Sequence, residues 1–104
     1  MGTIQEDRTY DQRQLNLMLG AIEDFRNRKI RIGKLVSDLE ALVSCLRTAD
    51  ESWTKAFASN WGKLEDIHAA LLDRNNRNLE GRDLETVVTA LAALTSLIRS
   101  RISA

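Results

Sequence analysis

The chain has 104 residues, and its 15 basic and 15 acidic side chains give a net charge of zero. One cysteine excludes an internal disulfide and a zinc site built from several cysteines, and one histidine excludes a site that needs several histidines. No stretch approaches the ~18 apolar residues of a membrane span, and the neutral charge argues against a strongly basic nucleic-acid binder. We therefore expect one domain over residues 1–104, with no cofactor, no metal and no membrane segment.

The composition favours helices throughout. The chain has 15 leucines and 11 alanines, a quarter of all residues, and no proline. Leucine and alanine are strong helix formers, whereas proline would interrupt a helix. The composition therefore predicts an all-α fold.

The first predicted helix runs from about Asp11 to Arg28. Its apolar residues recur at spacings of three and four and form one stripe: Leu15, Met18, Ile22 and Phe25. The tetrad that begins at Thr9 (Thr-Tyr-Asp-Gln) fits a capping box, in which side chains bind the free backbone N–H groups at a helix start. We expect the polar residues 1–8 to be frayed.

The second predicted helix runs from about Gly33 to Arg47, with a stripe of leucines at Leu35, Leu39, Leu42 and Leu46. The third runs from about Asp50 to Asp73. It can begin with a capping box at residues 48–51 or with Asp50 as its N-cap.

Aromatic residues distinguish the third helix. Its stripe comprises Trp53, Phe57, Trp61, Leu64, His68 and Leu71. Because the stripe continues as leucines, we interpret it as core and expect both tryptophans to be largely buried. Gly62 lies in the middle of this helix, where it costs about 1 kcal/mol relative to alanine, so it marks either a close helix–helix approach or a kink.

The fourth predicted helix runs from about Arg82 to Arg101. It carries the stripe Leu84, Val88, Leu91, Leu94 and Ile98, widened by further apolar residues, so we expect it to be the most buried helix. Four helices with short connections predict a compact antiparallel bundle.

We find no catalytic constellation in the sequence. Cys45 and His68 are the one candidate nucleophile–base pair, but Cys45 adjoins core leucines and is better interpreted as a buried thiol. Carboxylates adjacent in a helix point about 100° apart and do not converge on a substrate. No phosphate-binding, dinucleotide-binding, zinc-protease, calcium-loop or serine-hydrolase motif occurs. We therefore expect a protein that is not an enzyme.

Charge is unevenly distributed along the chain. Residues 35–81 hold eight acidic and five basic side chains, whereas basic residues cluster between Arg26 and Lys34. The basic cluster could contact phosphate, but we interpret it as a solvated helix end, with no direct nucleic-acid binding. The acidic segment predicts a docking face for a basic partner. Its candidate residues are Asp38, Glu40, Glu65, Asp66 and Asp73.

Four segments resemble small all-helical immunity proteins of bacterial contact-dependent growth inhibition and related polymorphic toxin systems. They are LMLGAIEDF (residues 17–25), IRIGKLVSDLEAL (30–42), DESWTKAF (50–57) and WGKLEDI (61–67). The resemblance implies a cytoplasmic protein that binds and neutralises the C-terminal toxin domain of a cognate effector, commonly a nuclease. It carries over no binding residues and does not identify the toxin.

An acidic, rigid helical face suits this role, because a nuclease presents a basic cleft for phosphates. The alternative is a non-enzymatic helical adaptor or a homo-oligomeric bundle, with the aromatic stripe partly exposed as a dimer interface.

Overall fold

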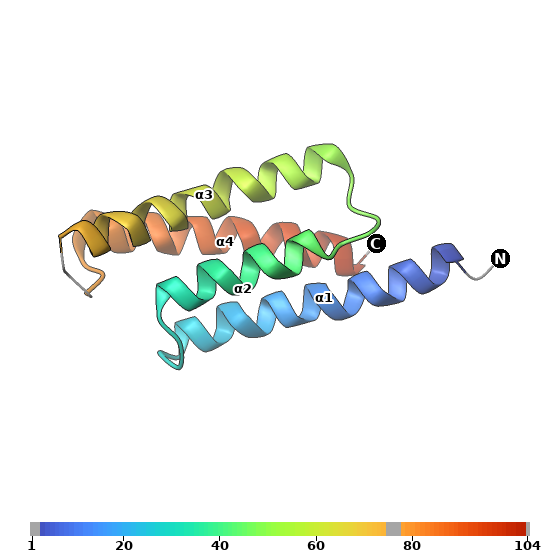
Figure 1. Cartoon of the computed structure of the whole chain (residues 1–104), viewed down its shortest axis with the longest axis horizontal. Helices are drawn as coiled ribbons and strands as arrows, with labels where there is room; N and C mark the ends of the chain where they lie inside the picture. Colours follow the sequence, from blue (N-terminus) through green and yellow to red (C-terminus); the bar gives the residue numbers. More distant parts are fainter. Residues whose placement is uncertain (1–2, 75–77, 104) are drawn as a thin grey trace.

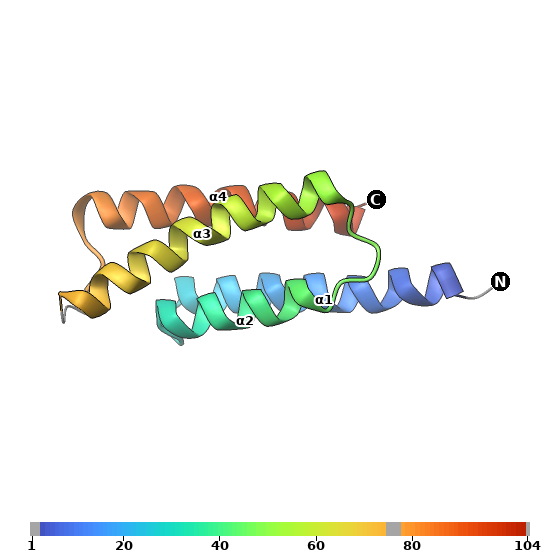
Figure 2. The ribbon, with the colours of Figure 1, turned by 45° about the horizontal axis from the view of Figure 1, so that its top comes forward.

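A computed structural model describes residues 3–74 and 78–103 of the chain. These residues form four helices, α1 (Thr3–Arg26), α2 (Ile32–Ser44), α3 (Glu51–Asp73) and α4 (Gly81–Ser103) (Figure 1). Consecutive helices pack against each other in antiparallel fashion, and α1 also packs against α4. Figure 2 shows the pair α3 and α4 lying over the pair α1 and α2. The prediction of an all-α four-helix bundle is confirmed.

The apolar stripes of the four helices meet in one core. Its fully buried large side chains are Phe57, Met18, Ile22, Leu35, Leu39, Leu64, Leu94, Ile98 and Val87. These residues lie on or beside the predicted stripes, because helical spacing alone decides which side chains share a face. No described helix is long and apolar enough to cross a bilayer.

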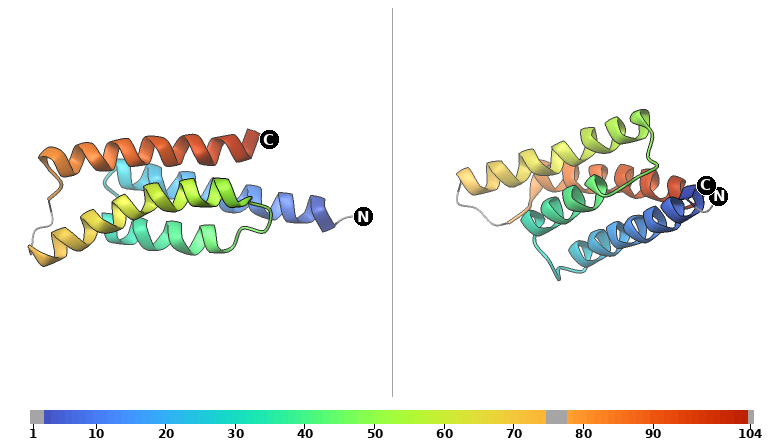
Figure 3. Two further views of the ribbon diagram at one scale, coloured as in Figure 1. Left: turned by 90° about the horizontal axis from the view of Figure 1, so that it is seen from above. Right: turned by 45° about the vertical axis from the view of Figure 1, so that its right-hand side comes forward.

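Two apolar residues of the fourth stripe are not in the core. Leu84 is 43% exposed and Val88 is 58% exposed. Helix α4 begins beyond the end of α1, so its first turns have no neighbouring helix on that side (Figures 1 and 3). The stripe predicted for α4 is therefore exposed at its first turns and buried at Leu91, Leu94 and Ile98.

Helix α1 begins earlier than predicted. The proposed capping box at residues 9–12 lies inside the helix, and residues 3–8 are helical, whereas residues 1–2 lie outside the described part. Tertiary contacts support these first turns, since Arg47 pairs with Asp7 at 3.2 Å and stacks over the ring of Tyr10 at 4.0 Å. Local propensity could not predict contacts with a segment 40 residues away.

A residue with left-handed backbone conformation follows the end of α1. Arg28 has φ of 62°, the conformation that glycine usually supplies at a helix C-terminus. Its N–H donates to the carbonyl of Phe25 at 3.0 Å, and the N–H of Lys29 donates to the carbonyl of Asp24 at 2.8 Å. These two bonds close the helix and turn the chain toward α2.

Asp50 begins α3. Its carboxylate accepts a hydrogen bond from the N–H of Trp53 at 2.8 Å. This N–H bond, together with one from the Ser52 hydroxyl, lowers the pKa of Asp50 below its ordinary value. Of the two predicted starts, the Asp50 cap is therefore correct and the capping box at residues 48–51 is not.

The aromatic stripe of α3 faces the interior. Trp53 and Phe57 are buried, and their rings stack with centroids 5.3 Å apart. Trp61 is only partly buried, so the prediction for the tryptophans is confirmed for Trp53 alone. The indole N–H groups bind carbonyls across the bundle, Trp53 to Leu97 at 2.8 Å and Trp61 to Val36 at 2.9 Å. This stripe therefore packs mainly against the other helices of the bundle, and Trp61 keeps part of its surface exposed.

Gly62 does not mark a close contact between helices. A Cβ atom at Gly62 would meet nothing within 4 Å, apart from its own helix. The tight position is Gly33 at the start of α2, where a Cβ would lie 2.7 Å from Nε2 of His68. Gly33 thus lets α2 approach the histidine of α3.

Candidate functional site

The candidate acidic residues lie on α2 and α3, and most of them face solvent. Glu40, Glu65, Asp66 and Asp73 are exposed, and none of the four forms an ion pair within the described residues. Asp38 is partly covered and pairs with Lys34 one turn earlier, at 3.2 Å. Four of the five predicted carboxylates therefore present free negative charge.

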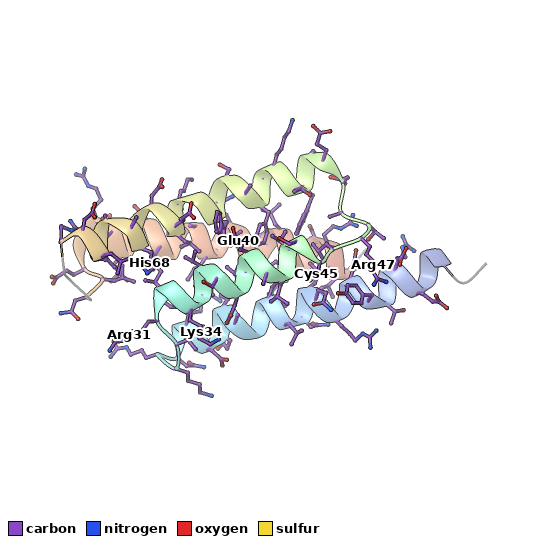
Figure 4. All side chains as sticks on the ribbon, viewed as in Figure 1. Arg31, Lys34, Glu40, Cys45, Arg47 and His68 are labelled. Atoms are coloured by element: carbon purple, nitrogen blue, oxygen red, sulfur yellow. The ribbon has the colours of Figure 1, made fainter. Side chains whose placement is uncertain are left out.

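The structure does not bring all five carboxylates together. Asp38 and Glu40 are two positions apart on a helix, which separates their directions by about 200°. Figure 4 shows Glu40 between α2 and α3. Asp38 follows Lys34 on the other flank of α2. Asp38 therefore does not belong to the same surface as Glu40.

The carboxylates of α3 form the more continuous surface. Asp66 and Asp73 are seven positions apart, two helical turns, so they lie on one side of α3. Glu65 lies one turn after Trp61, whose indole binds α2, and therefore borders the seam between α2 and α3. The outer side of α3 is the part of the predicted acidic face that the structure keeps together.

Cys45 and His68 cannot act as a pair. They lie near opposite ends of α2 (Figure 4), a helix of 13 residues and hence about 20 Å long. His68 packs on Gly33. Cys45 is exposed, which corrects the expectation of a buried thiol; it follows the last residue of α2, where the chain leaves the core. Its hydrogen bond with Tyr10 raises the pKa of that phenol.

The basic segment at residues 26–34 forms the turn between α1 and α2. Its five cationic side chains are exposed. Lys34 is engaged by Asp38, and Arg26 donates weakly to the hydroxyl of Thr95 at 3.5 Å. The described residues contain no group of three or more histidine, cysteine, aspartate or glutamate side chains arranged to hold a metal ion.

The most highly organised polar group was not among the sequence-based candidates. Asp11 is only 4% exposed. Its carboxylate accepts hydrogen bonds from the N–H of Arg47 at 2.9 Å, the N–H of Thr48 at 2.8 Å and the hydroxyl of Thr48 at 2.6 Å. Arg101 of α4 donates in turn to the carbonyl of Thr48 at 2.9 Å. Asp11 thus ties α1 to the connection between α2 and α3, and through it to α4.

These hydrogen bonds determine the ionisation of Asp11. Burial favours the neutral acid and raises its pKa. The Thr48 hydroxyl and the two N–H groups outweigh burial, with help from the positive charge of Arg101, so the pKa lies below its ordinary value of 3.8. A cavity of about 180 Å³ adjoins the carboxylate. Its lining comprises Arg8, Asp11, Gln12, Leu15, Thr48, Arg101 and Ile102.

The same contact explains why α2 ends early. The predicted helix continued to Arg47, but α2 ends at Ser44. The N–H groups of Arg47 and Thr48 bind the Asp11 carboxylate instead of helical carbonyls. The sequence does carry a signal for this site, because Asp11 precedes Leu15 by four positions and so continues the apolar stripe of α1 with a charged residue.

No family model, no curated protein and no solved structure shows significant similarity to this chain.

Proposed function

We propose that this chain is an immunity protein that neutralises a basic toxin domain, such as a nuclease, by binding to it. The observation that supports the proposal is the exposure of Glu65, Asp66 and Asp73 on α3, none of which has an ion-pair partner among residues 3–74 and 78–103. Glu40 adds charge at the edge of this surface. The resemblance of residues 17–67 to helical immunity proteins supports the same role.

The outer side of α3 is also open to a partner's backbone. Gly62 lies one turn before Asp66, with no atom near its missing Cβ. Ser59 and Ala69 on the same side are small and exposed. A partner segment can therefore lie close to the helix while its cationic side chains reach the carboxylates.

Inhibition in this scheme needs no chemical step by the immunity protein. A nuclease binds phosphate through cationic groups in its cleft. Carboxylates on a rigid helix can bind the same cationic side chains of the nuclease in place of phosphate. The bound immunity protein then sterically excludes the nucleic acid from the cleft. Charge complementarity of this kind speeds association and depends on salt.

Binding to the toxin domain encoded by the neighbouring gene tests the proposal. We expect the two proteins to co-purify after co-expression, and we expect the association rate to fall as salt rises. Asp66→Lys should weaken binding more than tenfold, which corresponds to about 1.4 kcal/mol, and leave the thermal stability unchanged. Glu23→Lys is the matched control, because Glu23 is an exposed carboxylate on α1.

A second pair of variants tests whether the open space beside Gly62 is needed for binding, without changing the charge of the surface. Gly62→Leu should block binding by filling the open space on α3. Gly20→Leu on α1 is the control, because Gly20 also has nothing within 4 Å of its missing Cβ. Full binding by both Gly62→Leu and Asp66→Lys would exclude the outer side of α3 as the toxin-binding surface, and failure of the pair to associate would refute the proposed function.

A further inference from the structure

The outer face of α4 differs from a typical solvent-exposed helix surface. Residues 86–98 (TVVTALAALTSLI) contain no charged side chain on any side of the helix. A surface helix normally carries charged or polar groups opposite its buried stripe, whereas this stretch of α4 exposes only small apolar and hydroxyl side chains. The outer side of α3 follows the normal pattern, with Lys55, Asp66 and Asp73 exposed.

No described part of the chain covers this uncharged face. Val88 is 58% exposed, and Thr89, Ala92 and Ser96 are exposed as well. Figure 3 (left) shows α4 at the edge of the bundle, with its neighbouring helices on the inner side only. About 20 Å of helix, at 1.5 Å per residue, therefore presents an uncharged surface to solvent.

The charges at the two ends of this face are opposite in sign and symmetrically spaced. Glu85 lies seven residues before Ala92, and Arg99 lies seven residues after it. A spacing of seven keeps all three residues on one side of the helix. Glu85 and Arg99 are both exposed, and neither forms an ion pair within the described residues.

We propose that two copies of this chain associate through the outer face of α4, antiparallel about a two-fold axis at Ala92. In this arrangement Glu85 of one copy faces Arg99 of the other, at both ends of the contact. Val88 of one copy meets Ser96 of the other, since each is four residues from the axis. The smallest of these side chains lies at the axis, where the helices come closest.

A second copy fits this face better than a partner of one charge sign. A basic segment would meet Arg99, and an acidic segment would meet Glu85. The α4 face is complementary to itself, which a two-fold interface requires. The chain has no net charge, so long-range repulsion between copies does not oppose the contact.

The contact involves one helix from each copy and is smaller than the standard interface of about 1,600 Å². We therefore expect a reversible dimer. Sedimentation velocity from about 10 μM to about 1 mM, a range that covers weak dissociation constants, should show the mass rising from 11.7 kDa toward twice that value.

Substitution at the axis tests the proposed face. Ala92→Glu places two carboxylates against each other in the dimer, and it should keep the chain monomeric over the same range. Ala41→Glu is the matched control on α2, since Ala41 is also exposed, and it should dimerise like the wild type. Circular dichroism and thermal unfolding verify that both variants are folded.

Charge reversal tests the pairing. Glu85→Lys and Arg99→Glu should each weaken the dimer at least tenfold, and the double variant should restore it because both pairs re-form with exchanged signs. A wild-type mass that stays at 11.7 kDa throughout, an Ala92→Glu variant that still dimerises, or a double variant as weak as the single ones would overturn the proposal. A monomeric wild type whose toxin binding is lost in Ala92→Glu would assign this face to the toxin instead.

Discussion

Replacing the buried Asp11 with alanine should strongly destabilise the fold. The change removes the acceptor for three donors, the N–H groups of Arg47 and Thr48 and the Thr48 hydroxyl. Hydrogen bonds to a charged group contribute about 1.5–3 kcal/mol each, and the donors left behind lose their partner in a partly buried region. We expect a loss of about 3–5 kcal/mol in the free energy of unfolding, as for removal of one member of a buried charged network.

Thermal unfolding followed by circular dichroism measures this effect. For a chain of this size 1 kcal/mol shifts the melting temperature by about 4–8 °C, so Asp11→Ala should melt at least about 12 °C below the wild type. Asp7→Ala is the control. It removes a solvent-exposed ion pair with Arg47, and exposed pairs contribute less than about 1 kcal/mol.

The pH dependence provides an independent check. The pKa of Asp11 is lower in the folded chain than its ordinary value of 3.8. Its stabilisation is therefore complete above that ordinary value and is lost as the pH falls through the lower, folded-state pKa. The isosteric variant Asp11→Asn should be less stable than the wild type at neutral pH, and this difference should shrink on acidification below about pH 4. An Asp11→Ala variant that melts within a few degrees of the wild type would show that other contacts hold the α2–α3 connection.

Three further predictions concern single positions. Gly33→Ala should lower the free energy of unfolding by about 1–3 kcal/mol, because its methyl group would overlap the packed histidine ring. Gly62→Ala should raise that free energy by about 1 kcal/mol through helix propensity. The chemical denaturation midpoints of the two variants should therefore shift in opposite directions. Arg28→Gly should raise the free energy of unfolding by about 1 kcal/mol, since it relieves the left-handed conformation of a residue with a side chain, and an unchanged or lower midpoint would contradict this. Trp53→Ala should lower the free energy of unfolding by about 3–5 kcal/mol, and Trp61→Ala should lower it less, because only Trp53 is fully within the core. Equal losses of stability in thermal unfolding would show that the different burial of the two tryptophans has no effect on stability.

The number, type and order of the helices were predictable because they depend on local spacing. Leu15, Met18 and Ile22 share a face in any helix, and the same holds for Leu35 and Leu39. The start of α1 depended instead on contacts with Arg47, which no local pattern contains. Whether an apolar stripe is buried depends on the length of the neighbouring helix, as Leu84 shows.

The sequence predicted that the candidate carboxylates are exposed, but it did not predict which of them share a surface. The free carboxylates of α3 are exposed as expected. The separation of Asp38 from Glu40 follows from helical geometry, because residues two positions apart point away from each other. The role of Asp11 was not predicted because Asp11 stands at the start of the first predicted helix, where an acidic residue is common, although its place on the apolar stripe indicated burial.

The closed ring of helix contacts has a consequence for topology. Each helix contacts the next helix in the chain, and α4 contacts α1. Helices α1 and α4 are therefore the one pair of neighbouring helices that is not joined by a loop. Because these two helices are antiparallel, the end of α4 and the start of α1 lie at the same end of the bundle (Figure 1). A short linker there would make the chain cyclic, and any other connection could then be opened without altering which helices are neighbours. We therefore expect all four helix orders to specify the same packed bundle.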